Sequence, residues 1–164
     1  MAEQLVFSKI YTFKEVLKSA LAYFDGDELA ATTWINKYAM KNKNGEFLES
    51  TPHNMHQRMA TEFARIEKKY LGKGKSTEGL SVYGKKREFL SEQAIFEMFK
   101  DFKYIIPQGS VMSSLGNKNT IASLSNCVVV PPVYDSYGGI FYTDQQLAQL
   151  FKRRCGVGVD LSNL

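Results

Sequence analysis

Hydrophobic residues recur every three to four positions in four segments between Phe13 and Phe102, the spacing that places them on one face of an α-helix. Thr12 is a suitable N-cap for a helix over residues 13–24, and Asp27 for a second helix through Met40. Thr51-Pro52 opens a third helix, which reaches about Tyr70, and a fourth follows Ser91. The apolar positions expected to face a core are Phe13, Val16, Leu17, Ala20, Leu21, Phe24, Leu29, Trp34, Ile35, Tyr38, Met55, Met59, Phe63, Ile66, Ala94, Ile95, Met98 and Phe102.

The pattern changes after Pro107. Residues 108–119 are rich in Gly, Ser and Asn and predict a polar loop, within which Met112 and Leu115 are of the buried type. Residues 128–130 are three valines that run into two prolines, so they predict a short strand buried on both faces. Asn126 and Cys127 stand at its start, where buried polar groups are costly unless paired or used.

A second strand is expected over residues 155–161. Between the strands we expect a turn over 134–139 and then a helix opened by the capping box Thr143-Asp144-Gln145-Gln146, with Leu147, Leu150 and Phe151 facing inward. This strand–helix–strand order favours parallel pairing through a right-handed crossover. Two strands alone are not a stable sheet, so the pattern predicts the first part of a larger α/β domain.

Composition narrows the class of protein. A hydrophobic content of 44% and a net charge of +4 indicate a folded, mildly basic chain that is compatible with nucleotide ligands. No apolar run approaches the roughly 20 residues of a membrane span, and the N-terminus lacks a signal-peptide pattern, so we expect a cytoplasmic protein without membrane partners. Glycines and basic residues gather over 71–87, which favours a solvated basic loop over a phosphate contact.

Several residues are candidates for chemistry. The role of Cys127 is undecided from the residues alone: it could be a nucleophile, a radical carrier, half of a redox pair or a packing residue. Gly156-Val157-Gly158 lacks the third glycine of a dinucleotide fingerprint, which favours a tight start to a strand. His53 and His56 have no third ligand in view, so we expect surface histidines and no metal site.

The segment Asp135-Ser136, followed by two glycines, has two readings. It is either a simple turn or a nucleotide-binding turn, in which a carboxylate meets a sugar hydroxyl and backbone amides meet phosphate. The residues alone leave both readings open.

Four separate blocks of sequence carry a resemblance to a known family. They are Pro107-Gln108-Gly109-Ser110, Leu124-Ser125-Asn126-Cys127, Tyr134-Asp135-Ser136-Tyr137-Gly138-Gly139-Ile140 and Arg153-Arg154-Cys155-Gly156-Val157-Gly158-Val159-Asp160-Leu161-Ser162-Asn163-Leu164. In order and spacing they resemble the catalytic (large) subunit of ribonucleotide reductase. Residues 24–30 and 34–39 resemble that family's N-terminal helical region, and nothing resembles its ATP-binding cone. Because it lacks the cone, the chain most resembles the adenosylcobalamin-dependent (class II) members of the family. Members that use a separate metal-containing radical subunit are the alternative.

The resemblance implies an α/β protein with a mainly helical N-terminal region over 1–103. Residues 104–164 would then begin a ten-stranded α/β barrel, here incomplete. It implies a reductase of the ribonucleoside-diphosphate type, which converts ribonucleotides to 2′-deoxyribonucleotides for DNA synthesis. In that reaction a thiyl radical activates the sugar, and two cysteines on barrel strands supply the electrons.

Site residues follow from the same resemblance. Cys127 matches the first cysteine of the redox pair. Three residues match positions that contact substrate: Asn126, Cys127 and Gly156. Ser110 is the fourth substrate residue that the resemblance implies. It belongs to the pair Gly109-Ser110, which stands where the family often has a serine or threonine followed by proline. The residues that match the loop for the deoxynucleotide effector at the dimer interface are Asp135, Ser136 and Tyr137.

The radical cysteine, the second redox cysteine and the C-terminal cysteine pair of the family have no counterpart here. Cys155 stands where the family has a small residue, and it receives no catalytic role. We therefore expect an N-terminal fragment that is inactive alone and needs the remaining barrel polypeptide, a homodimer partner, and thioredoxin or glutaredoxin as reductant. The alternative is a non-catalytic module that binds nucleotides or nucleic acid, or that dimerises through residues 143–154.

Overall fold

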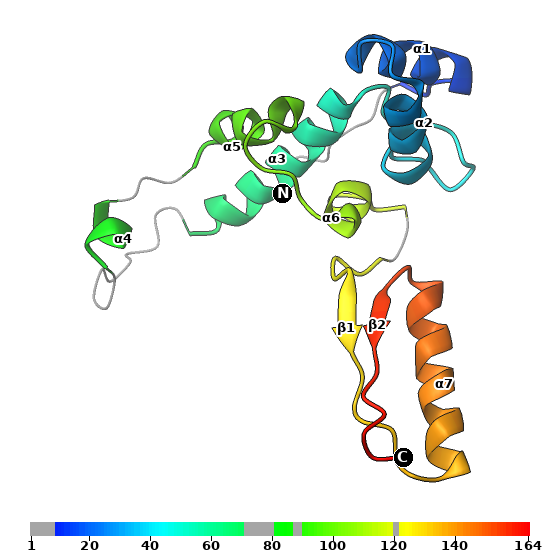
Figure 1. The fold of residues 1–164 in the computed structure, drawn as a ribbon. Coiled ribbons are helices and arrows are strands. Elements are labelled where there is room, and N and C mark those ends of the chain that lie inside the picture. Colours follow the sequence, from blue (N-terminus) through cyan, green and yellow to red (C-terminus); the bar gives the residue numbers. More distant parts are fainter. Residues whose placement is uncertain (1–8, 71–80, 87–89, 120–121) are drawn as a thin grey trace.

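A computed structural model describes residues 9–70, 81–86, 90–119 and 122–164 (Figure 1). Its helices are α1 (Phe13–Tyr23), α2 (Glu28–Lys37), α3 (Pro52–Lys68), α4 (Val82–Lys86), α5 (Glu92–Phe99), α6 (Gly109–Ser114) and α7 (Tyr137–Lys152), with a 3-10 turn η1 (Lys100–Phe102). Two strands, β1 (Cys127–Val129) and β2 (Gly156–Gly158), flank α7 in the sequence. The helical region and the strand–helix–strand unit (residues 127–158) meet at α6.

The expected helix starts are confirmed by their caps. The amide of Glu15 donates to the Thr12 hydroxyl, and the Glu15 carboxylate accepts from the Thr12 amide at 2.7 Å. The Asp27 carboxylate accepts from the amide of Ala30 at 2.9 Å. These bonds satisfy amides that have no partner within their own helix.

Two helices end earlier than expected. α2 ends at Lys37 rather than Met40, and α5 ends at Phe99. Beyond α5, Asp101 and Phe102 adopt left-handed φ values of 55° and 56°, which interrupt the α-helix.

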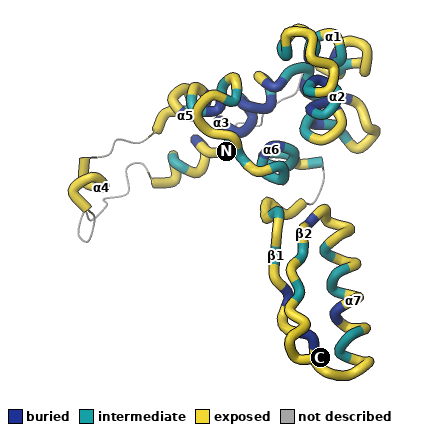
Figure 2. Tube along the Cα trace, in the orientation of Figure 1, coloured by how far each residue is buried: buried dark blue, intermediate teal, exposed yellow. Residues whose placement is uncertain are grey.

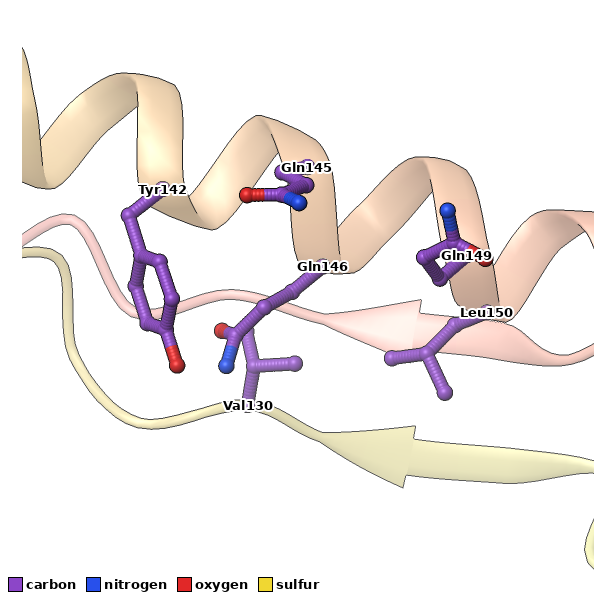
Figure 3. Close-up of a pocket in the computed structure, with 6 residues that line it drawn as sticks. All are labelled: Val130, Tyr142, Gln145, Gln146, Gln149 and Leu150. Atoms are coloured by element: carbon purple, nitrogen blue, oxygen red, sulfur yellow. The ribbon is translucent and has the colours of Figure 1, made fainter.

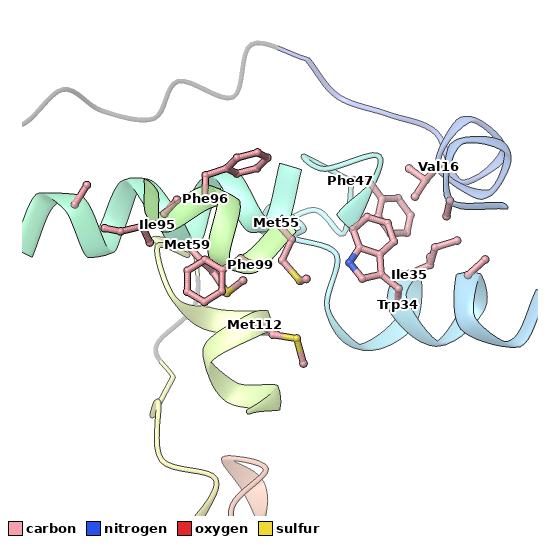
Figure 4. Close-up of a cluster of buried hydrophobic side chains, with 14 residues drawn as sticks. Val16, Trp34, Ile35, Phe47, Met55, Met59, Ile95, Phe96, Phe99 and Met112 are labelled. Atoms are coloured by element: carbon pink, nitrogen blue, oxygen red, sulfur yellow. The ribbon is translucent and has the colours of Figure 1, made fainter. Parts of the chain in front are cut away.

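The hydrophobic core lies in the helical region (Figure 4). Figure 2 shows the buried stretches gathering on α2, α3 and α5. Some positions expected to face the core are exposed, because the apolar stripe of each helix is wider than the surface that its described neighbours cover. The exposed ones are Phe13 (52%), Leu29 (78%), Phe63 (42%), Ile66 (41%) and Ala94. The central buried side chains are Val16, Trp34, Ile35, Phe47, Met55, Met59, Ile95, Phe96, Phe99 and Met112.

β1 and β2 pair in parallel, as the strand–helix–strand order predicted. Cys127 lies opposite Gly156, and Val129 opposite Gly158. The prediction that β1 is buried on both faces is wrong, since Val129 is 79% exposed and burial alternates along the strand. Within the described ranges, β1 is flanked by one strand, and its outer face is uncovered.

α7 begins at Tyr137, so the predicted turn over 134–139 and the predicted start at Thr143 are wrong. Ser136 is the N-cap, and its hydroxyl accepts from the amide of Gly139 at 3.0 Å. Thr143 lies inside the helix, buried, and donates to the Gly139 carbonyl. A Cβ at Gly139 would lie 2.3 Å from the Tyr134 carbonyl oxygen, so only glycine lets the first helical turn pack so closely. Phe151, expected inward, is 57% exposed.

Two predicted loops contain helix. The segment 108–119 includes α6, on which Met112 is buried as expected. Of the basic segment 71–87, residues 71–80 and 87 lie outside the described ranges. Of the described residues 81–86, Val82–Lys86 form α4, which carries Lys85 and Lys86. No helix in the described ranges is long and apolar enough to cross a membrane.

Candidate functional site

Cys127 carries a free, exposed thiol at the first position of β1. Partners in a parallel pair share a face of the sheet, so the thiol lies over Gly156. The contact is close, because a Cβ at Gly156 would lie 3.1 Å from the Cys127 sulfur. The Gly156 amide also donates to the Asn126 carbonyl at 2.7 Å. Glycine at position 156 therefore leaves open space beside the thiol.

The side chain of Asn126 joins the start of β1 to α6. Its carbonyl oxygen accepts from the Ser110 amide at 2.8 Å and from the Ser110 hydroxyl. Its amide group donates to the side-chain oxygen of Gln108. The structure thus brings together Ser110, Asn126, Cys127 and Gly156, all four residues predicted to contact substrate.

The three predicted effector residues lie elsewhere. Asp135, Ser136 and Tyr137 follow the C-terminal end of β1, whereas Cys127 begins the strand. Asp135 and Tyr137 are exposed, and the Ser136 hydroxyl already caps α7. Sequence reasoning missed this capping role, since Thr143 offers a competing box.

Sequence reasoning also missed a buried ion pair beneath α6. Arg58 of α3 and Glu49 are both fully buried, and the Arg58 Nε lies 2.7 Å from Glu49 Oε1. Arg58 Nη2 donates to the Met112 carbonyl at 2.8 Å, and Nη1 donates to the Leu115 carbonyl. The available signal was an arginine between Met55 and Met59 on the apolar face of α3.

His56 is only 1% exposed, which corrects the prediction of a surface histidine. Neither ring nitrogen has a hydrogen-bond partner among the described residues, and the Phe102 ring packs edge-on at 4.6 Å. Burial lowers the pKa of His56 to about 4, although the nearby Asp101 charge acts to raise it. The imidazole is therefore neutral at pH 7 and packs as part of the core.

The other groups with possible chemistry do not add to this site. His53 is exposed and lies against the Phe96 ring. Cys155 is buried with its thiol donating to the Gly156 carbonyl at 3.4 Å. Cys155 comes directly before β2, and its thiol also lies 4.0 Å from the Ser125 carbonyl oxygen. In the described part of the chain, no three His, Cys, Asp or Glu side chains gather where they could hold a metal ion.

A pocket lies between α7 and Val130, the residue that follows β1 (Figure 3). None of the residues predicted to form a site lines it. It is lined by Val130, Tyr142, Gln145, Gln146, Gln149 and Leu150.

The comparisons with known proteins decide the family. The family model described as "Ribonucleotide reductase, all-alpha domain" matches residues 24–120, more than half of the chain. The chain belongs to the ribonucleotide reductase family. No curated protein and no solved structure matched it in the corresponding searches.

The extent of the match separates two parts of this ribonucleotide reductase chain. The matched residues run from the end of α1 through α6, and they include Ser110, Glu49 and Arg58. Asn126, Cys127 and Gly156 lie beyond the match. The family match therefore does not extend to the roles predicted for these three residues.

Proposed function

We propose that this chain is the N-terminal part of a ribonucleotide reductase catalytic subunit, in which Cys127 reduces the ribose of a bound ribonucleotide. One observation carries the proposal: Ser110, Asn126, Cys127 and Gly156 come from three separate segments and are joined at the start of β1, where Ser110 bonds to the Asn126 side chain and the exposed Cys127 lies opposite Gly156. A preorganised thiol next to open space is suited to a reaction that requires close approach to the sugar. Residues 104–164 begin the catalytic barrel in this proposal.

The reaction oxidises two thiols for each ribonucleotide. Cys127 and a second thiol give up two electrons and two protons and form a disulfide. The 2′-hydroxyl leaves as water, and a hydrogen replaces it at C2′. Cys155 does not supply the second thiol in this proposal, because its thiol is buried and bonded to the Ser125 and Gly156 carbonyls, whereas Cys127 is exposed. The partner thiol then belongs to further polypeptide, and the 164-residue chain is inactive alone.

The radical that starts the reaction also comes from outside this chain. In the proposal it is generated with adenosylcobalamin, or alternatively by a separate metal-containing radical subunit. His56 is enclosed in the core, and His53 packs against Phe96, so neither histidine is placed as a ligand for such a group. The described residues do not fit a cofactor site, and their contribution is to position the substrate and the reducing thiol.

Effector binding and dimerisation complete the proposal. Asp135 and Tyr137 are exposed at the start of α7, and the Ser136 hydroxyl keeps its own proton to donate while it accepts from Gly139. α7 also exposes Phe141 (69%) and Tyr142 (63%), the aromatic content typical of an interface. A second subunit would cover this helix and close the deoxynucleotide effector site.

Reconstitution tests the proposed function. The purified chain is mixed with a polypeptide that carries the remaining barrel strands, a ribonucleoside di- or triphosphate, adenosylcobalamin or a radical subunit, and thioredoxin. We expect deoxyribonucleotide from the mixture and none from the chain alone. Cys127→Ser abolishes turnover, whereas the matched variant Cys155→Ser retains it.

Two results would contradict the proposal. Turnover by the chain alone would overturn its dependence on further polypeptide, and full activity of Cys127→Ser would overturn the redox role. Salt-dependent binding of DNA or RNA that is unaffected by Cys127→Ser would instead favour a non-catalytic module.

A further inference from the structure

The guanidinium of Arg58 divides its donors between two parts of the helical region. On one side Nε and Nη2 donate to the two carboxylate oxygens of Glu49, at 2.7 and 3.3 Å. On the other side the guanidinium donates to the carbonyls of Met112 and Leu115, at the C-terminal end of α6. Glu49 in turn accepts from the Met40 amide at 2.9 Å, which fixes the carboxylate in place. A buried charge that is fully bonded in this way holds its partners in one geometry.

α6 is a short helix that also packs against the core through apolar side chains. It spans six residues, with Met112 buried and Val111 and Leu115 partly buried against the core. Two polar side chains at its N-terminal end, Gln108 and Ser110, bond to Asn126. α6 therefore lies between Arg58 and Asn126, and it is the direct polar link from the helical core to the strand that carries Cys127.

The exit from α6 is shaped to the same arginine. Gly116 has φ +77°, a conformation that side chains rarely adopt. A Cβ there would also lie 3.0 Å from the Arg58 Cγ and 3.0 Å from the Glu62 Cγ. The chain thus passes directly over the aliphatic part of Arg58 as it leaves α6.

We propose that Arg58, held by Glu49, is a positioning residue for the substrate site: it fixes α6 so that Ser110 and Gln108 hold Asn126 beside Cys127. The substrate role of this site rests on the proposed function, whereas the positioning of Asn126 rests on the contacts alone. A purely structural role would be different. In that case the pair would stabilise the helical core as a whole, and the bonds at Asn126 would not depend on it.

A double variant separates the two roles. Glu49→Gln with Arg58→Met removes the ion pair without leaving an unpaired buried charge, and such replacements are often neutral for stability. Glutamine still offers an oxygen to the Met40 amide, but methionine has nothing to donate to Met112 and Leu115. The matched control is Met59→Ala, which makes a cavity in the core one residue along α3 and removes no hydrogen bond to α6.

The readouts are nuclear magnetic resonance measurements on the ¹⁵N-labelled 164-residue chain. In the double variant we expect the Ser110 amide to exchange with solvent at least about tenfold faster, because α6 loses two bonds to a charged donor. The side-chain amide signals of Asn126 shift towards those of a solvated asparagine. Met59→Ala leaves the Asn126 signals in place, since its folded state retains every bond to α6.

Unchanged Ser110 exchange and unchanged Asn126 signals in a folded double variant would overturn the proposal. If the double variant does not fold, Arg58→Lys carries the same test. Lysine keeps the charge opposite Glu49, but a single ammonium does not span the carboxylate and both carbonyls. None of these readouts requires reductase turnover, so failure of the reconstitution assay would count against the proposed function and leave this result standing.

Discussion

The absence of a side chain at Gly156 leaves room for the thiol of Cys127. A Cβ at Gly156 would lie 3.1 Å from that sulfur, closer than ordinary van der Waals contact. Gly158 lies on the same face of β2, two residues further on, and a Cβ there would meet Val129 at 3.4 Å. The two glycines thus offer a matched pair of tests on one strand.

We expect Gly156→Ala to slow the reaction of Cys127 with a thiol reagent several-fold, because the added methyl group crowds the sulfur. The same crowding costs about 1 kcal/mol in the free energy of unfolding. Reaction rates measured by absorbance, alongside thermal unfolding, check both effects. Gly158→Ala is the control and leaves the Cys127 rate near that of the wild type. Equal rates in all three proteins would show that the contact at Gly156 does not constrain the thiol.

The buried histidine makes stability depend on pH. Burial depresses the pKa of His56 to about 4, whereas the unfolded chain binds this proton near pH 6.5. Protonation therefore favours the unfolded state as pH falls from 6.5 to 4, and roughly 3 kcal/mol of stability is lost across that window. Urea unfolding at a series of pH values measures this loss.

His56→Met removes the buried titrating group, and its unfolding free energy falls by roughly 3 kcal/mol less over the same window. His53→Gln, at an exposed position of α3, serves as the control and follows the wild type. If His56→Met loses as much stability as the wild type on acidification, the cause lies with other groups.

For single residues, the sequence predicts site residues that belong to blocks resembling a known family. It misses residues whose partners become clear only from the packing of the folded chain. Ser110, Asn126, Cys127 and Gly156 were predicted together, and the structure brings them together. Arg58 was not singled out, because two of its partners are carbonyls 54 and 57 residues away. Backbone carbonyls carry no mark in a sequence that says which arginine they accept from.

Among the elements, α7 shows how local rules compete. Both Ser136 and Thr143 fit the start of a helix, and the glycines between them disfavour helix. The helix begins at Tyr137 with Ser136 as its N-cap, because Gly139 allows the first turn to pack against the Tyr134 carbonyl. The capping-box pattern favoured the later start, whereas the close approach of Gly139 to Tyr134 goes with the earlier one.

Ser136→Ala removes the N-cap bond to the Gly139 amide and is expected to cost about 1 kcal/mol of stability. Ser136→Asp restores an acceptor at the cap and recovers most of that loss. Thermal unfolding followed by circular dichroism measures both variants. A larger effect of Thr143→Ser than of Ser136→Ala would contradict this assignment of the cap.

Over the whole molecule, burial is uneven. The helical region holds the hydrophobic core, while β1 and β2 make only a two-stranded sheet with an uncovered face. The sequence predicted the parallel pair, since order and periodicity are local properties. It could not predict the exposure of Val129. A run of valines indicates that a strand can be buried, but it does not show whether another element packs over that strand.

This unevenness predicts two levels of protection from hydrogen exchange. The Val130 amide, bonded to the Gly158 carbonyl, exchanges well before the buried amides of α3. Ile35→Ala, a cavity in the helical core, accelerates α3 and leaves Val130 unchanged. Mass spectrometry of exchanged peptides measures both regions. Equal acceleration in the two would show that they unfold as one cooperative unit.

The partners of Arg58 also set an order for events on the ribosome. Glu49 is nine residues from Arg58 and leaves the ribosome ahead of it, so the ion pair can form early. The carbonyls of Met112 and Leu115 are translated more than fifty residues later. Until then the guanidinium remains half-bonded and must keep contact with water. Docking of α6 is therefore the step that completes the helical region during synthesis, and a translational pause before Leu115 would leave that region open.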